Sequence, residues 1–313
     1  MKTIKERTGL KILTYSAIML FLFFTSCKDN DKIDFDANDN SNLQSESNSE
    51  AQLEDVSDMG SVAVSSDAGT LSGGKTGETA GNPRNITISD TRFACATVTL
   101  EFAADNVPGS VNPPVVANPH GTITIDFGNG CTGPNGRVRK GKILIEFKGR
   151  RFLPGSYVIL SFANFSVDGI KVEGTRTETN ASESLESAPK FNIVELDMKV
   201  TYTDGTFATR NSTRTRTWIR KSNPLEDEWT VTGEASGVTR KAKDYVMTIT
   251  KALKFKRACA ISSKVVIPVE GTKELVVDGK KITLDFGSGE CDTKLTITVN
   301  GKSKEVEVSA NGN

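Results

Sequence analysis

The sequence is poor in the residues that active sites and nucleic-acid interfaces commonly need. Its 313 residues include one histidine and two tryptophans, and aromatic residues make up 7% of the chain. Basic and acidic residues number 39 each, so the chain carries no formal net charge. Nucleic-acid-binding domains usually carry a strong and clustered basic charge. We therefore expect no nucleic-acid partner.

The scarcity of histidine restricts the mechanisms open to an enzyme. His120, the single histidine, stands between Pro119 and Gly121 in a segment that we expect to be a loop. A Ser-His-Asp or Cys-His mechanism would have to use it, yet the sequence has no nucleophile elbow. The paired carboxylates of a glycan hydrolase come from distant positions and form no recognisable motif in the sequence. A carboxylate-dependent glycan hydrolase therefore stays open as an alternative. We predict no catalytic residue and a non-enzymatic protein.

Apolar runs of membrane-spanning length are also missing near the start of the chain. The apolar run of residues 12–24 is shorter than the roughly 20 residues that a membrane-spanning helix needs. A basic start followed by a short apolar run is typical of a cleaved signal peptide. The basic residues are Lys2, Lys5, Arg7 and Lys11.

The residues after this run, Phe24-Thr25-Ser26-Cys27, resemble the lipobox of bacterial lipoproteins. The resemblance implies a signal peptide over residues 1–26 and a lipid membrane as partner, through an acyl anchor on Cys27. Residues 28–31, Lys-Asp-Asn-Asp, resemble the export tag of Bacteroidota lipoproteins. The tag implies the outer membrane with exposure on the cell surface, and a periplasm-facing position is the alternative.

Residues 27–82 contain three basic and twelve acidic residues, and they are rich in Asp, Asn, Ser, Glu and Gly. Such a segment buries too little apolar surface to offset the entropy lost on ordering. The helical periodicity between Leu43 and Val56 is poor. We predict a disordered acidic tether that precedes a folded body over residues 83–313, which holds 32 basic and 26 acidic residues.

The body alternates short β-prone runs with turn dipeptides. Asn or Asp followed by Gly supplies the positive φ angles of a tight hairpin turn. With no long helical pattern in the body, the class is predicted as all-β, with antiparallel sheets built from hairpins. The dipeptides are Asp168-Gly169, Asp204-Gly205, Asp278-Gly279 and Asn300-Gly301, and among the expected strands are 122–127, 142–147, 157–167, 191–203, 206–220, 229–232, 245–250 and 295–299.

Two segments, about 93–149 and 257–301, are similar to each other. Each begins with Ala-Cys-Ala and later carries a strand that ends in Asp-Phe-Gly-x-Gly and a cysteine, at 126–131 and at 285–291. We interpret them as duplicated units that flank a longer β-rich middle. The body thus resembles a group of Bacteroidota envelope lipoproteins with paired Asp-Phe-Gly-x-Gly…Cys units. The resemblance implies location and architecture but no activity. Protein kinases also contain an Asp-Phe-Gly motif, but their other motifs are absent from this sequence.

Four cysteines remain once Cys27 is assigned to the lipid, in a compartment that permits disulfides. Four cysteines allow three pairings, and the duplication favours Cys95 with Cys131 and Cys259 with Cys291. A zinc site would need closer Cys-x-x-Cys spacing. We predict two disulfides, no metal and no cofactor.

An arginine-rich strand, residues 213–220, is the strongest candidate for a ligand site. Alternate residues of a strand share a face, so Arg214, Arg216, Trp218 and Arg220 line one side together with Arg210. Guanidinium groups and an indole can bind anionic groups while stacking on a sugar. Alternatively, the arginines pair with acids on neighbouring strands and Trp218 covers apolar surface.

The first choice of function is a membrane-anchored envelope lipoprotein with a non-enzymatic structural or interaction role, whose partner would be an envelope protein. The alternative is a surface glycan- or polyanion-binding lipoprotein that uses the arginine strand to hold an acidic glycan.

Overall fold

The computed structural model describes residues 35–66, 82–104, 119–133, 136–263, 265 and 267–307. The expected signal peptide, Cys27 and the export tag lie outside these residues. All described elements belong to one compact unit, residues 33–313. Within the described part of the chain, no helix is both long and apolar enough to cross a membrane.

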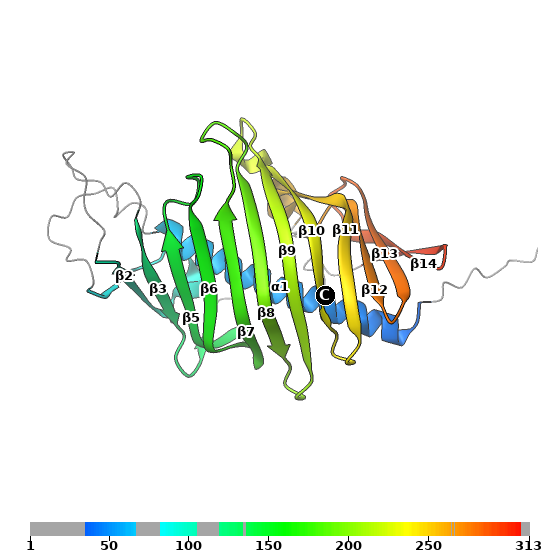
Figure 1. The fold of residues 1–313 in the computed structure, drawn as a ribbon, viewed down its shortest axis with the longest axis horizontal. Coiled ribbons are helices and arrows are strands. Elements are labelled where there is room, and N and C mark those ends of the chain that lie inside the picture. Colours follow the sequence, from blue (N-terminus) through cyan, green and yellow to red (C-terminus); the bar gives the residue numbers. More distant parts are fainter. Residues whose placement is uncertain are drawn as a thin grey trace, which may run out of the picture. The chain divides into compact units, whose positions relative to one another are not determined.

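The described strands form a single antiparallel sheet of fifteen strands (Figure 1). Neighbours in the sheet are neighbours in the sequence, except that the short β4 pairs with one end of β5. This confirms the predicted antiparallel β class. The strands are β1 (Arg84–Asn85), β2 (Thr97–Phe102), β3 (His120–Asp126), β4 (Cys131–Thr132), β5 (Val138–Lys148), β6 (Tyr157–Val167), β7 (Ile170–Asn180), β8 (Lys190–Thr201), β9 (Phe207–Ile219), β10 (Glu228–Val238), β11 (Asp244–Lys256), β12 (Glu270–Val277), β13 (Lys280–Ser288), β14 (Lys294–Val299) and β15 (Lys302–Glu307).

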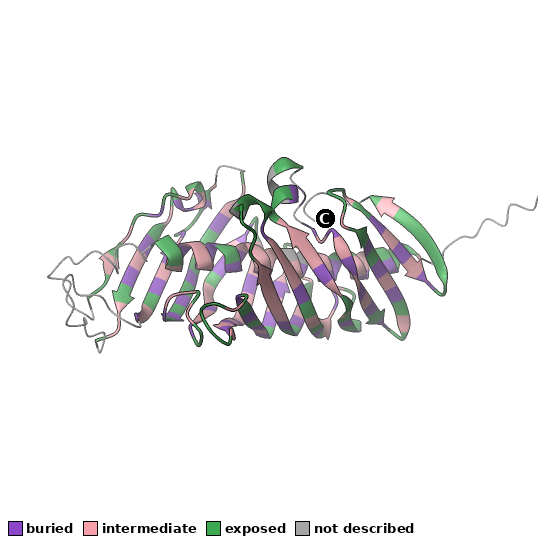
Figure 2. Ribbon diagram, turned by 90° about the horizontal axis from the view of Figure 1, so that it is seen from above, coloured by how far each residue is buried: buried purple, intermediate pink, exposed green. Residues whose placement is uncertain are grey.

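The strands alternate buried and more exposed side chains, as the banding in Figure 2 shows. In β3, Ile123 and Ile125 are buried, whereas the intervening Thr124 is half-buried. A side-chain period of two places one set of residues on each face of a sheet. The sheet therefore has an inner face that carries the core and an outer face rich in threonine.

Three of the four predicted hairpin turns have the expected backbone. Both residues of Asp168-Gly169, for example, have positive φ angles, 51° and 80°. The prediction is wrong for Asp204, because among these two residues only Gly205 has a positive φ. There the Asp204 carboxylate accepts hydrogen bonds from the backbone and hydroxyl of Thr206, which holds a different turn.

Both predicted disulfides, Cys95–Cys131 and Cys259–Cys291, are present. The first joins the turn after a short helix to Cys131, the first residue of β4, and the second joins a short helix to the loop after β13. The helices are η1 (Thr91–Phe93), which ends just before Cys95, and α2 (Arg257–Ser262), which contains Cys259. In each case the Asp carboxylate, of Asp126 or Asp285, accepts a hydrogen bond from the glycine amide two residues later. A further short helix, η2 (Pro224–Glu226), lies between β9 and β10.

The prediction of a disordered tether is wrong over residues 37–66, which form the helix α1 (Ala37–Ser66). At about 1.5 Å per residue, its 30 residues span about 45 Å. Figure 1 shows α1 crossing the strands on the inner face. It begins near β13, where Asp39 pairs with Lys280, and reaches η1, where Asp58 contacts Arg92 at 2.7 Å.

The two halves of α1 pack against different surfaces. Leu53, Val56, Met59 and Ala63 are almost fully buried and belong to the main apolar core of β2–β8. The N-terminal half instead buries polar residues, including Glu46 and Ser49. A helix of weak propensity within a protein gains most of its stability from tertiary packing. The segment folds because the sheet supplies partners that composition alone does not reveal.

Candidate functional site

The predicted arginine row lies on the inner face of the sheet, beneath α1. Strand β9 points Arg210, Arg214 and Arg216 toward the helix, in register with inward residues of neighbouring strands. Arg176 on β7 and Glu195 on β8 are direct register partners in the same layer. Lys273 on β12 completes the group from the other side of β9 and is also buried.

Helix α1 faces this layer with three carboxylates, those of Glu46, Glu50 and Glu54. Residues four apart lie on one side of a helix, one above the other. The spacing therefore forms an acidic row along α1 that faces a basic row on the sheet.

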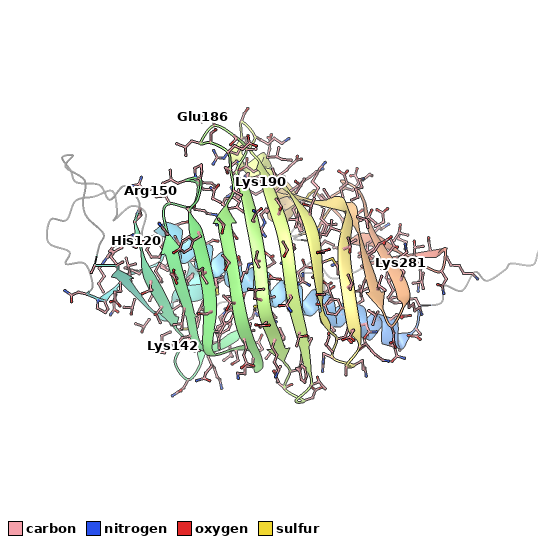
Figure 3. All side chains as sticks on the ribbon, viewed as in Figure 1. His120, Lys142, Arg150, Glu186, Lys190 and Lys281 are labelled. Carbon is pink, nitrogen blue, oxygen red and sulfur yellow. A yellow bond between two sulfur atoms is a disulfide. The ribbon has the colours of Figure 1, made fainter. Side chains whose placement is uncertain are left out.

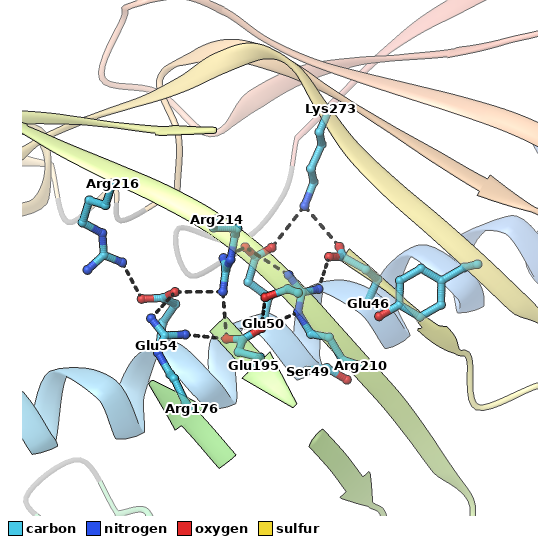
Figure 4. A network of polar contacts seen from close by, with 12 residues as sticks. Glu46, Ser49, Glu50, Glu54, Arg176, Glu195, Arg210, Arg214, Arg216 and Lys273 are labelled. Atoms are coloured by element: carbon cyan, nitrogen blue, oxygen red, sulfur yellow. Dashed lines mark hydrogen bonds and ion pairs between the residues drawn. The ribbon is translucent and has the colours of Figure 1, made fainter. Parts of the chain in front are cut away.

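The two rows meet in direct ion pairs, which Figure 4 draws as dashed lines. Moving along the helix, each glutamate contacts two or more cations, and neighbouring glutamates share some of them. The N–O distances are 2.7 Å from Glu46 to Arg210 and 3.1 Å to Lys273, 2.6 Å from Glu50 to Arg214 and 3.3 Å to Lys273, and 2.8 Å from Glu54 to Arg216 and 3.1 Å to Arg176.

Glu195 joins the cations from below, within the sheet. Its side chain is fully buried, with no exposed area, and it accepts hydrogen bonds from Arg176, Arg210 and Arg214. The Ser212 hydroxyl donates to the same carboxylate. One carboxylate thus ties together three guanidinium groups from the strands on either side of it.

The electrostatics of this layer keep Glu50, Glu54 and Glu195 ionised. Burial by itself raises the pKa of Glu50, but the charges of Lys273, Arg214 and Arg210 outweigh burial and lower the pKa to about 2. The same balance of burial against neighbouring cations lowers the pKa of Glu54 and of Glu195 well below the usual range. We call the nine residues the helix–sheet charge layer: Glu46, Glu50, Glu54, Arg176, Glu195, Arg210, Arg214, Arg216 and Lys273.

No protein-family model, curated protein or solved structure matches this chain. Within the described residues, no group of three or more His, Cys, Asp or Glu side chains is placed to hold a metal ion. The charge layer must therefore be interpreted from its own geometry, in which the guanidinium groups already contact carboxylates of the same chain.

The structure separates the four candidate ligand residues into two pairs. Arg214 is 3% exposed and Arg216 16% exposed, and both contact α1. Trp218 is half-buried and donates a hydrogen bond from Nε1 to Asp227 at 3.0 Å. Arg220 is exposed, with its guanidinium 5.0 Å from the ring centre of Phe152.

The single histidine, His120, is the first residue of β3 and pairs with Lys148 of β5. Its placement in a loop was therefore wrong.

Sequence reasoning missed the partners of the arginine row. It noted acids on neighbouring strands as an alternative, and Glu195 fits that description. The main partners, Glu46, Glu50 and Glu54, lay in the segment expected to be disordered. A signal was available, because three glutamates at a four-residue spacing and arginines at a two-residue spacing indicate opposing charged rows on a helix and a strand.

Proposed function

We propose that the protein is a lipid-anchored envelope protein with a non-enzymatic interaction role, and that the outer face of its sheet is the contact surface. The proposal combines the expected anchor at Cys27 with one observation about the body. None of the described helices or strands covers the outer face, whereas α1 lies along the inner one (Figure 1).

The outer face offers a broad surface of mixed character. Threonines from adjacent strands are register partners on it, such as Thr215 with Thr232 and Thr217 with Thr230. Exposed apolar side chains lie among them, including Leu196, which is 55% exposed. Figure 3 views this face, with Lys142 near one end and Lys281 near the other. Non-obligate protein interfaces have a similar mixture of polar and apolar area.

The charge layer supports the choice of the outer face. Its guanidinium groups form ion pairs with α1, so binding of an external polyanion there would have to displace three glutamates. The outer face needs no such displacement. We accordingly place the contact with an envelope protein on the threonine-rich side.

In-cell photo-crosslinking tests this assignment. A photoreactive residue would be placed at Thr213 or Thr232, which are exposed on the outer face, and at Gln44, which is exposed on α1. We expect crosslinked species of higher mass from the two outer positions and few from Gln44. Equal yields from all three positions, or none from the outer pair, would contradict the proposal.

The anchor has its own test. Cys27→Ala should abolish palmitate labelling and leave the precursor unprocessed, and normal labelling of this variant would rule out lipidation at Cys27. Replacing Asp29 and Asp31 by Ala should remove the protein from protease-accessible surface while it stays membrane-bound, if the tag directs it outward.

A second candidate function, binding of a surface glycan, is supported by the exposed Arg220 above Phe152. Retention of the protein on an acidic glycan column, lost in Arg220→Gln and reduced as salt rises, would favour it. Equal retention of the variant would exclude this pair as the site.

A further inference from the structure

A pocket of about 380 Å³ lies at the C-terminal end of α1, away from the charge layer. It opens between the helix end, the inner face of β3 and β5, and the loops that follow β5 and β7. Its walls are mainly apolar, and the side chains that matter here are Val64, Ile123, Phe147, Phe152, Leu153 and Leu185. Ligand pockets have volumes of about 300–1,000 Å³ and mostly apolar walls.

Two large apolar side chains at this pocket are exposed. Phe152 is 43% exposed and Leu185 is 59% exposed, and they come from different loops. Apolar side chains that gather at an opening, rather than being scattered over a surface, are typical of a binding site. The deeper walls, Ile123 and Phe147, are buried and belong to the main core, so the floor is rigid.

The polar part of the lining is basic. Arg150 and Arg151 both line the pocket. Arg151 is held by Glu178, which lies 3.2 Å from its Nη2. The buried Nε of Arg150 has no hydrogen-bond partner among the described residues. No carboxylate is among the lining residues, and Glu186, next to Leu185, is exposed in its loop (Figure 3).

We propose that this pocket binds an amphiphilic carboxylate, with its acyl chain against Phe147, Phe152 and Leu185 and its carboxylate on Arg150. The apolar walls would contact the acyl chain, and the Arg150 guanidinium would pair with the carboxylate headgroup. A charged hydrogen bond of this kind is stronger than a neutral one. This site is separate from the outer face. It shares Phe152 with the Arg220–Phe152 pair, but its charge comes from Arg150 and not from Arg220, so the Arg150→Gln and Arg220→Gln variants test the two sites separately.

Photoaffinity labelling of the full chain as isolated from cells, in phosphatidylcholine nanodiscs, tests the proposal. The probe is dodecanoate with a diazirine in its chain, and adducts are located by peptide mass spectrometry. We expect adducts on the peptides that carry Phe152 and Leu185. Unlabelled dodecanoate should compete, and decanoate should compete more weakly, because each buried methylene strengthens binding about fourfold. Dodecanol, which lacks the charge, should compete poorly.

Variants separate the pocket from unspecific labelling. Arg150→Gln should reduce labelling about tenfold, the effect of losing one charged hydrogen bond. Leu185→Ser should also reduce it without affecting folding, because this side chain is largely exposed. Lys281→Gln, which removes an exposed cation from β13, is the matched control and should label as the wild type does. Labelling spread over the whole protein, equal competition by dodecanol, or full labelling of Arg150→Gln would overturn the proposal.

Discussion

At the scale of single residues, Glu195 is the side chain on which most of the charge layer depends. It is fully buried and contacts three guanidinium groups. A buried ion pair adds little net stability over an apolar pair, but removal of one partner leaves uncompensated charge and is strongly destabilising. The loss of Glu195 would leave Arg176, Arg210 and Arg214 dependent on the glutamates of α1 alone.

We predict that Glu195→Gln lowers the free energy of unfolding by about 3–5 kcal/mol, because the amide keeps the shape but not the charge. Urea denaturation measures the change. Glu234→Gln, an exposed position on the outer face of β10, should change stability by less than about 0.5 kcal/mol. Equal effects of the two substitutions would show that the buried charge is not needed.

The lowered pKa values of Glu50, Glu54 and Glu195 predict a pH dependence of defined sign. These carboxylates bind protons less readily in the folded chain than in the unfolded chain, so acid favours unfolding. The stabilisation is complete above the ordinary glutamate pKa of 4.5 and is lost as the pH falls toward the folded pKa of Glu50, about 2.

Urea denaturation at several pH values tests this dependence. We expect the free energy of unfolding to fall between pH 4.5 and pH 2 in the wild type, and to fall less steeply in Glu50→Gln. A free energy of unfolding that rises as the pH falls from 4.5 to 2 would contradict the ion pairs.

At the scale of elements, α1 behaves as two segments joined end to end. Its C-terminal half packs into the apolar core and adds ion pairs through Glu54 and Asp58, whereas its N-terminal half relies mainly on ion pairs. A change in charge should therefore affect the first turns most. We predict that Glu50→Lys raises hydrogen–deuterium exchange over residues 37–50 and leaves residues 53–63 protected. Gln44→Lys, on the exposed side of the same half, should leave exchange unchanged. Uniform loss of protection along α1 would show that the two halves are not separable.

The elements that sequence reasoning found are those whose pattern depends on local chemistry. The strand expected over residues 157–167 coincides with β6, because the segment is rich in β-branched and aromatic residues and Asp-Gly follows it. The strand expected to end at Thr232 runs on to Val238. Gly233 interrupts the β-prone sequence pattern, and the pairing of β10 with β11 is irregular at this point. A glycine is needed here because an added Cβ would lie 2.2 Å from the carbonyl oxygen of Thr213. Helix α1 was missed for a different reason. The cations that pair with its glutamates Glu46, Glu50 and Glu54 lie more than 100 residues away in the sequence.

At the scale of the whole molecule, the two faces of one sheet differ in what they contact. The inner face is occupied by α1 through the charge layer and the apolar core. We propose that the outer face contacts a partner, and the expected lipid anchor would hold the body at the membrane. The two disulfide-containing units flank strands β7 to β9 of the charge layer, and Lys273 on β12 lies within the second unit. Their common origin stays a prediction.

The central claim is that the arginine row serves α1 and is not a free ligand site. Arginine modification by phenylglyoxal, followed by peptide mass spectrometry, tests it within one sample. We predict that Arg176, Arg210 and Arg214 react far more slowly than the exposed Arg220, and that Glu50→Lys speeds the reaction of Arg214. Reaction of Arg214 as fast as that of Arg220 in the wild type would contradict the claim.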